Sequence, residues 1–359
     1  MGDTEGLRMD VWKQPLRLVR PLRISRSTTT VVENVFIAIT VAGEVGYGEA
    51  APGPWRGEPI EAILRYLEGA ATLLGDDPFD ADAIFSRLDQ RLGENRAARS
   101  AVDMALTDLV GKLVGTPVFR LLGLDATRTC DLCYTIGLGP VEEMVKAAVD
   151  AASAFSAIKI KLGGPDDATI VREIAAAVDV PLRVDANGGW SARRTLDLLD
   201  EVLVPCGVTL LEQPVPAADL RALAEVHERS PIPVIADESV TDLASLRPLV
   251  GRCSGIDVKL TKCGGMREAL RLISAARAFD LSVMIGCEVE TSLAISAAAV
   301  LTCLADHADL DLHLWLENDP FVGVGLRDGK FVLPAGPGIG AEPTHELRTP
   351  PTGSSPGPT

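Results

Sequence analysis

Short apolar runs recur at regular intervals over residues 130 to 315, and each run ends in a polar or charged residue. Such runs, separated by helical patterns, are typical of buried strands in a parallel sheet. Their ends fall at Thr135, Lys161, Asp185, Glu212, Asp237, Lys262, Glu288 and then Asp309 or Asp311. About 25 residues separate successive ends, enough for one strand and one helix. Eight units of nearly equal length predict a closed α/β barrel rather than an open sheet with a switch point.

The polar strand ends predict a metal site at the mouth of this barrel. In such barrels, functional residues collect at the carboxyl ends of the strands. Asp185, Glu212 and Asp237 end three consecutive strands, so their carboxylates can converge on one point. Three oxygen ligands of this kind suit Mg²⁺, which keeps further octahedral positions for water or a substrate oxygen.

Two lysines interrupt the apolar run AIKIKLG at 157–163. In a strand, Lys159 and Lys161 point to the same side, where each ammonium group disfavours the charged form of the other. A strand end whose lysine stems reach water is the alternative interpretation. Lys161 and Lys262 end the second and sixth strands, which lie opposite each other in an eight-stranded barrel. We predict that they exchange a proton with opposite faces of one carbon, while Lys159 binds a substrate oxygen.

Five motifs extend this pattern beyond single residues. They are KIK at 159–161, DAN at 185–187, EQP at 212–214, ADES at 236–239 and KCGG at 262–265. In this order and spacing the chain resembles the muconate-lactonizing subgroup of the enolase superfamily, and within it the dipeptide epimerases. The resemblance covers nearly the whole chain. It implies a modified (β/α)7β TIM-type barrel with an N-terminal α+β capping domain.

The resemblance also implies roles for individual residues. Asp185, Glu212 and Asp237 would bind one Mg²⁺ per subunit. Lys161 and Lys262 would move the α-proton of the C-terminal residue of a dipeptide through an enediolate, the lysine and magnesium chemistry of this superfamily. Two further residues, Asn187 and Glu238, would hold the metal ligands in place, whereas Lys259 is interpreted as structural.

Four residues are predicted to bind the substrate together with Lys159. The segment ADLDLHL supplies Asp309 and Asp311 where dipeptide epimerases bind the substrate ammonium, although a solvated strand end would look the same. Thr135 ends the first strand. Glu288 stands where relatives often have an apolar residue, and a buried, unpaired carboxylate there would favour a cationic or polar side chain.

Two loops of the capping domain leave the identity of the dipeptide undetermined. The segments at 23–30 and 51–59 contain Arg23, Arg26, Trp55 and Arg56. An arginine that contacts the substrate would favour an acidic side chain, which is opposite to the effect expected of Glu288.

Composition narrows the partners. The net charge of −16 and the pI of about 4.7 argue against binding to nucleic acid or anionic membranes. Neither an apolar signal core at the N-terminus nor an apolar stretch of about 18 residues occurs. The seven cysteines do not suggest a disulfide framework, and Cys130 and Cys133 alternate along a strand without a second pair. We expect a cytoplasmic homo-oligomer that acts on a small dipeptide.

The predicted domains follow from these patterns. Residues 1–125 form the capping domain, completed by about 316–340, and residues 126–315 form the barrel. Residues 341–359, rich in Pro, Gly, Ser and Thr, form a disordered tail. Two alternative functions stay open. A muconate-type cycloisomerase or o-succinylbenzoate synthase would use the same lysines and metal without an ammonium clamp, and an N-acylamino acid racemase would act on a substrate without a free ammonium.

Overall fold

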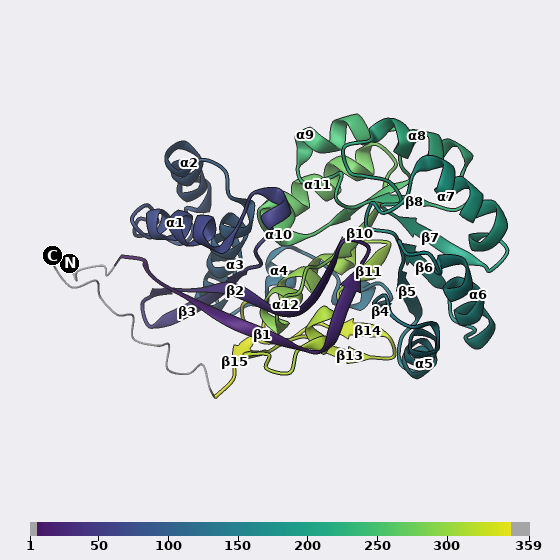
Figure 1. The fold of residues 1–359 in the computed structure, drawn as a ribbon. Helices are drawn as coiled ribbons and strands as arrows, with labels where there is room; N and C mark the ends of the chain where they lie inside the picture. Colours follow the sequence, from purple (N-terminus) through teal and green to yellow (C-terminus); the bar gives the residue numbers. More distant parts are fainter. Residues whose placement is uncertain (1–5, 346–359) are drawn as a thin grey trace.

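The computed structural model describes residues 6–345, which form a barrel and a smaller part that packs against it (Figure 1). The smaller part begins with an antiparallel sheet in the order β1-β2-β3. These strands are β1 (Arg8–Ile24), β2 (Ser27–Val41) and β3 (Glu44–Ala50). The helices α1 (Ile60–Ala71), α2 (Ala81–Leu92) and α3 (Arg96–Leu113) cover one face of the sheet. This arrangement is the predicted α+β capping domain.

Strand β2 has apolar side chains on both faces because both faces are covered. Ile37 and Ile39 pack into the core formed with the three helices. Phe36 points the other way and stacks on Trp12 and on Phe321, whose ring centroids lie 5.8 Å and 5.9 Å away. The alternation of period two therefore places successive residues in two different cores.

The barrel is a sheet of eight parallel strands in sequential order. They are β4 (Cys133–Ile136), β5 (Ala157–Lys161), β6 (Leu182–Asp185), β7 (Val208–Glu212), β8 (Val234–Ala236), β9 (Gly255–Val258), β10 (Ser282–Gly286) and β11 (His307–Asp309). A parallel bridge between Leu132 and Ala308 brings the last strand beside the first. The structure thus confirms the predicted (β/α)7β barrel.

Helices surround the barrel, as the alternating pattern of the sequence predicts (Figure 1). They are α5 (Val141–Ala152), α6 (Asp167–Ala177), α7 (Ala192–Leu198), α8 (Leu220–Arg229), α9 (Leu243–Leu246), α10 (Leu260–Cys263), α11 (Met266–Ala278) and α12 (Ser292–Leu301), after the short α4 (Val118–Leu121) that precedes the barrel. Inside the barrel, Leu210, Ile235 and Met284 form a small apolar cluster. Two residues further along, β7 carries Glu212 and the segment after β8 carries Asp237, so the apolar layer forms the floor of a charged site.

Lys262 does not end a strand, contrary to the sequence-based prediction. Strand β9 ends at Val258, and Lys262 lies in the single-turn helix α10. Gly264 ends this turn with φ of 96°, a left-handed conformation that glycine adopts without strain. The sequence did not distinguish this turn from a continuing strand, because Leu260 and Cys263 are apolar and buried.

The segment after the barrel packs on both parts of the molecule. Its strands are β12 (Phe321–Val322), β13 (Gly325–Arg327), β14 (Lys330–Val332) and β15 (Glu342–Pro343). Asn318 accepts a hydrogen bond of 2.7 Å from the backbone of Arg17 in β1. Strand β15 pairs with β12, so the predicted disordered tail starts too early at 341, because main-chain pairing holds this segment in place. Residues 346–359 lie outside the described residues. Within the described part of the chain, no helix is long and apolar enough to span a bilayer.

We expect Gly48→Ala to destabilise the capping domain. A Cβ atom at residue 48 in β3 would lie 2.0 Å from the carbonyl oxygen of Ala101 in α3, so the strand and helix would have to separate. Overpacking of this kind costs about 2 kcal/mol. Urea unfolding followed by circular dichroism measures the change. Gly325→Ala is the matched control, because nothing lies within 4 Å of its added Cβ. Equal stability of the two variants would contradict the predicted clash.

Candidate active site

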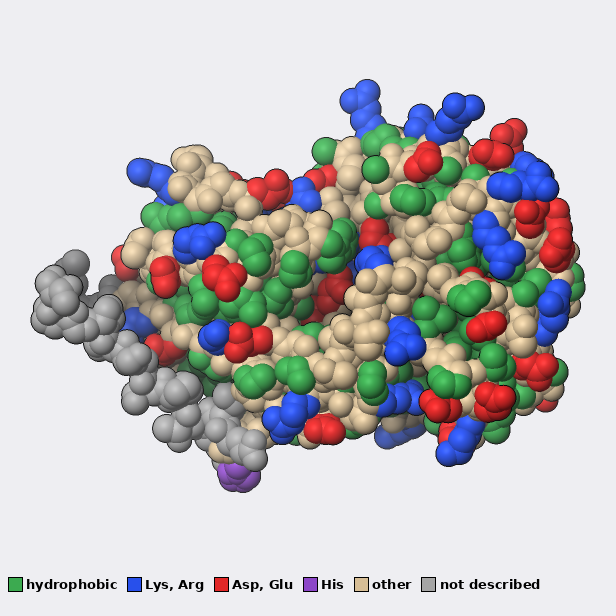
Figure 2. Space-filling view, in the orientation of Figure 1, with side chains coloured by type: hydrophobic (Ala, Val, Ile, Leu, Met, Phe, Trp, Pro, Cys, Tyr) green, Lys and Arg blue, Asp and Glu red, His purple; other side chains and the backbone are tan. Residues whose placement is uncertain are grey.

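A cavity of about 670 Å³ lies between the capping domain and the mouth of the barrel. The capping domain lines it with apolar residues such as Ile24 and Pro54 and with Arg26 and Trp55. The barrel side contributes charged residues, which are Lys161, Asp237, Glu238, Lys259 and Glu288. Figure 2 shows this hollow with acidic side chains in its depth. The cavity therefore has an apolar wall and a charged floor, as small-molecule sites commonly do.

Asp185, at the end of β6, is buried and held by several donors. Its carboxylate accepts hydrogen bonds from Lys161 Nζ at 2.6 Å and from the backbone and side-chain nitrogens of Asn187 at 2.8 Å and 3.2 Å. Burial raises the pKa of Asp185, but Lys161 and Lys159 outweigh it, and the pKa ends below its usual value. Asn187 also donates to Glu238 at 3.2 Å, so the two predicted supporting residues do contact each other.

Lys159 lies inside the barrel rather than on the cavity wall. Its ammonium forms ion pairs with Glu212 at 2.7 Å, with Asp185 at 3.2 Å and with Asp309. Burial acts to lower the pKa of Lys159, but Asp309 and Glu212 raise it well above its usual value. In this structure Lys159 binds carboxylates of the chain itself, not the open cavity where a substrate oxygen was predicted.

Lys161 lines the cavity beside Asp185. Burial is the largest influence on its pKa and lowers it, and the neighbouring Lys159 lowers it further, as the sequence suggested. The carboxylate of Asp185 acts against both, and the pKa of Lys161 ends above its usual value. A proton therefore resides on Lys161 while Asp185 is its partner.

Lys262 and Lys259 meet at Asp237 on the other side of the mouth. Lys262 Nζ donates to both the side chain and the backbone oxygen of Asp237, the latter at 2.6 Å. Lys259 Nζ donates to the second carboxylate oxygen at 2.8 Å. Burial raises the pKa of Asp237, but the two lysines lower it well below its usual value. Lys259, which the sequence assigned to structure, thus lines the cavity and holds a predicted metal ligand.

Thr135, Asp309 and Asp311 form a buried group below the cavity. The backbone nitrogen and the hydroxyl of Thr135 donate to Asp311 at 2.7 Å and 2.9 Å, and the hydroxyl also reaches Asp309 at 3.2 Å. Burial and then the charge of Asp309 raise the pKa of Asp311 to about 7. The structure brings these three predicted residues together, but with one another and with Lys159 as their partners.

Glu288 lines the cavity but is not an unpaired carboxylate. It lies 3.1 Å from Arg56, whose guanidinium also contacts Glu58 at 3.0 Å. The expected preference for a cationic side chain assumed that Glu288 is buried and unpaired. This assumption is wrong, because Arg56 of the capping loop supplies a counter-charge. The other loop reaches the barrel too, since Arg26 pairs with Glu238 at 2.8 Å and donates to the carbonyl of Asn187 at 2.8 Å.

Asp257 on β9 belongs to the site although the sequence analysis did not select it. One carboxylate oxygen from each of Glu212, Asp237 and Asp257 lies within 4.8 Å of the others. The spacing in the sequence could have identified Asp257, because it precedes Lys259 by two residues, just as Lys159 precedes Lys161. Side chains two apart on a strand share one face, here the inside of the barrel.

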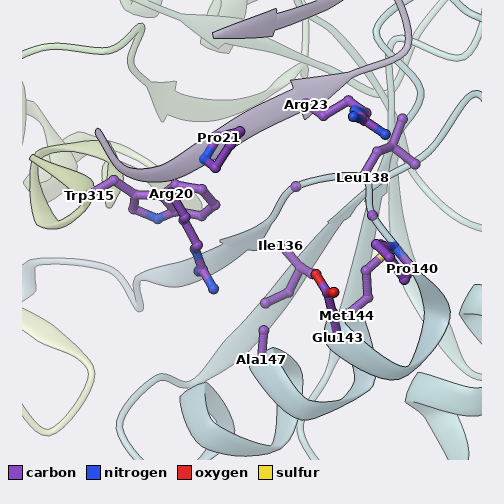
Figure 3. A pocket seen from close by; sticks show the side chains of 12 residues that line it. Arg20, Pro21, Arg23, Ile136, Leu138, Pro140, Glu143, Met144, Ala147 and Trp315 are labelled. Carbon is purple, nitrogen blue, oxygen red and sulfur yellow. The ribbon is translucent and has the colours of Figure 1, made fainter. Parts of the chain in front are cut away.

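A second, smaller cavity of about 200 Å³ lies outside the barrel mouth, between β1 and α5 (Figure 3). Its most prominent cation, Arg20, lies over the ring of Trp315 at 4.1 Å and donates to the hydroxyl of Tyr134 at 2.8 Å. Arg23, from the first of the predicted loops, also lines this cavity and donates to Thr28. These contacts engage both arginines of the smaller cavity, whereas the larger cavity holds the predicted lysines and carboxylates.

The donor set at the barrel mouth fits a hard divalent cation. Among the described residues, Glu212 Oε1 and both side-chain oxygens of Asp257 are buried without a hydrogen-bond partner. Buried carboxylates without a partner are costly, and a cation removes this cost. Oxygen-only ligation is characteristic of Mg²⁺.

Comparisons with known proteins agree with this geometry. Residues 8–123 match the mandelate racemase / muconate lactonizing enzyme N-terminal domain, and residues 141–347 match the enolase C-terminal domain-like family. The L-Ala-D/L-Glu epimerase of Bacteroides thetaiotaomicron is 38% identical over 93% of this chain and 87% of its own length. Muconate cycloisomerase 1 of Rhodococcus opacus is 32% identical over 90% and 92%. The crystal structure of an Enterococcus faecalis dipeptide epimerase complexed with Mg and L-Leu-L-Tyr is 31% identical with a TM-score of 0.89, and the match covers 94% of this chain and 99% of that chain.

Magnesium is expected to stabilise the folded protein. A cation bound to the folded state alone raises the free energy of unfolding by about 2.7 kcal/mol when its free concentration is about 100 times Kd. Thermal unfolding with increasing MgCl₂, at constant ionic strength set with KCl, measures this effect. Glu212→Gln, which keeps the shape of the side chain and removes its charge, should abolish most of the shift. An equal shift in both proteins would place the bound cation elsewhere.

Proposed function

This chain belongs to the mandelate racemase / muconate lactonizing enzyme family of the enolase superfamily, and we propose that it is a dipeptide epimerase. It is an isomerase that inverts the α-carbon of the C-terminal residue of a dipeptide by moving one proton. The observation that carries the proposal is the placement of two lysines around a carboxylate cluster, with Lys161 at the end of β5 and Lys262 in α10 after β9. Three strands separate β5 from β9 in either direction around the barrel.

The two lysines are proposed as the acid and base. One neutral amine removes the α-proton from its face of the substrate, and the ammonium on the opposite face returns a proton there, which inverts the carbon. In this structure each lysine contacts a carboxylate, Lys161 contacting Asp185 and Lys262 contacting Asp237. Asp185 raises the pKa of Lys161, so Lys161 must be released from this carboxylate before it acts as a base.

We propose that Asp185, Glu212 and Asp237 would hold a single Mg²⁺ per subunit, which would supply Lewis-acid stabilisation of developing negative charge when bound. Its positive charge would also compete with the lysines for these carboxylates. Lys259 then keeps one contact with Asp237, and Asn187 keeps Asp185 in place. These residues orient the proposed ligands without touching the substrate.

Asp309 and Asp311 are proposed to bind the ammonium group of the dipeptide, with Thr135 holding both carboxylates. Lys159 pairs with Asp309 and with Glu212, so it joins the proposed ammonium site to the proposed metal site. A cation at Glu212 would weaken one of these ion pairs. Lys159 would then be free to contact a substrate oxygen, as the sequence predicted.

The cycloisomerase alternative uses the same lysines and carboxylates, and one relative carries that name. An ammonium clamp has no role in that reaction or in the racemisation of an N-acylamino acid. The buried pair of Asp309 and Asp311 favours a substrate with a free amino group, since two adjacent carboxylates below an apolar-walled cavity need positive charge to balance them.

We also propose a compartment and an oligomeric state for the protein. Seven free thiols, five of them buried, are consistent with a reducing compartment, and we propose the cytoplasm. We also propose that the protein is a homo-oligomer. Each subunit would hold a complete site, because both lysines and all proposed metal ligands come from one chain.

Incubation with Mg²⁺ and a library of L,L-dipeptides in deuterated water tests the proposed reaction. We expect replacement of the α-hydrogen by deuterium with inversion at the C-terminal residue, and loss of turnover after chelation of the metal. Because the lysines face opposite sides of the carbon, Lys161→Ala and Lys262→Ala should each lose inversion, yet each should still exchange the α-proton of one epimer. Exchange of both epimers by both variants at the wild-type rate would contradict the two-base assignment.

Glu288 is proposed to influence which side chain the cavity accepts. In Glu288→Gln, Arg56 keeps only Glu58 as a charged partner, so the rim gains positive character. We expect kcat/KM for acidic dipeptides to rise relative to cationic ones by roughly tenfold, the effect of one hydrogen bond to a charged group. Competition within one dipeptide mixture measures the ratio. Glu61→Gln, an exposed residue on the same cavity, serves as the control. An unchanged ranking in Glu288→Gln would remove Glu288 from the specificity residues.

A further inference from the structure

Asp257 points into the barrel, where the absence of a side chain at Gly286 leaves space for its carboxylate. Its strand pairs with β10, where Asp257 lies opposite Met284 and Gly286 follows two residues later. A Cβ atom at residue 286 would lie 2.5 Å from Asp257 Oδ2. Any larger residue there would displace the carboxylate. The glycine therefore makes room for the Asp257 side chain beside the proposed metal ligands.

The carboxylate of Asp257 is fully buried and has no hydrogen-bond donor, and its ion pair with Lys259 is long. Neither of its side-chain oxygens accepts a hydrogen bond from any of residues 6–345. The nearest ammonium, Lys259 Nζ, lies 3.6 Å from Oδ2 and 2.8 Å from Asp237. Lys262 approaches Asp257 only at the backbone oxygen, at 2.9 Å. A charged group without a partner in the protein interior costs several kcal/mol unless something else supplies positive charge.

The ion pairs around the site fall into two groups. One group joins Lys159 and Lys161 to Asp185, Glu212 and Asp309. The other joins Lys259 and Lys262 to Asp237 and Asp257. Glu212 from the first group faces Asp237 and Asp257 from the second, with oxygens within 4.8 Å of one another. Carboxylates thus face carboxylates across the boundary, and a cation bound between them would offset their repulsion.

We infer that Asp257 is a fourth carboxylate ligand of the divalent cation, binding it together with Glu212 and Asp237. The inference rests on the proposed cation site and adds a ligand that the sequence motifs do not supply. Asp185 already accepts hydrogen bonds from Lys161 and Asn187, whereas Asp257 and Glu212 Oε1 have unused oxygens. An additional carboxylate strengthens binding through its charge, and through its geometry it affects cations of different size unequally.

Isothermal titration of the metal-free protein with MgCl₂ and with CaCl₂ tests the inference. We expect Asp257→Asn to raise the Kd for Mg²⁺ at least tenfold, and to change the Kd for Ca²⁺ by a different factor. Asp103→Asn is the matched control, because Asp103 is a buried carboxylate with an unpartnered oxygen and takes no part in the ion pairs of the barrel mouth. Its Kd should stay within about threefold of the wild type. Equal losses in the two variants, or none in Asp257→Asn, would overturn direct binding by Asp257.

A measurement on the unaltered protein covers the case in which Asp257→Asn does not fold. Crystals soaked with MnCl₂ locate the cation by anomalous diffraction at the manganese edge. A manganese peak about 2.2 Å from an Asp257 oxygen supports the inference, and one more than about 3.5 Å away overturns it. The dipeptide exchange reaction is measured separately. Wild-type protein that binds Mg²⁺ and epimerises dipeptides, with the cation remote from Asp257, would reject this ligand alone and leave the proposed function intact.

Discussion

The burial of opposite charges at the mouth of the barrel governs this structure. The apolar floor of Leu210, Ile235 and Met284 excludes water from below, and the capping domain covers the site from above. In such surroundings each charge must have a partner, because desolvation of an isolated ion costs more than the folded state can compensate. The parallel strands supply these partners by aligning lysines and carboxylates at one edge. The pairing of residues distant in sequence thus follows from the closure of the barrel.

The capping domain contributes to this charge network rather than only covering it. Arg26, in the β1–β2 turn, contacts Glu238 and the carbonyl of Asn187, and so reaches residues adjacent to Asp237 and Asp185. On β2, Asn34 donates to Glu49 at 2.7 Å and to the carbonyl of Val289 at 2.9 Å. The second contact positions the segment after β10 that carries Glu288. The two loops and this hydrogen-bonded junction therefore shape the wall of the cavity together.

The sequence predicted the positions of the strands well because one polar residue per strand end is a strong periodic signal. It was wrong about Lys262, since a single helical turn with buried Leu260 and Cys263 has the same pattern as a continuing strand. It did not select Asp257, because this residue lies within an apolar run and not at its polar end. Pairing across domains, as between Glu288 and Arg56, has no local signal and required the folded chain.

The lack of a local signal also explains why the sequence identified Asp309 and Asp311 but did not predict their ion-pair and hydrogen-bond partners. A DxD segment at a strand end predicts two carboxylates on one side, which the structure places against Thr135. Only the three-dimensional arrangement shows that Lys159 pairs with Asp309, Asp185 and Glu212 at once. One ammonium shared by three carboxylates leaves negative charge uncompensated. The lysine ion pairs of the mouth join four lysines to five carboxylates, an excess of negative charge that a bound cation would balance.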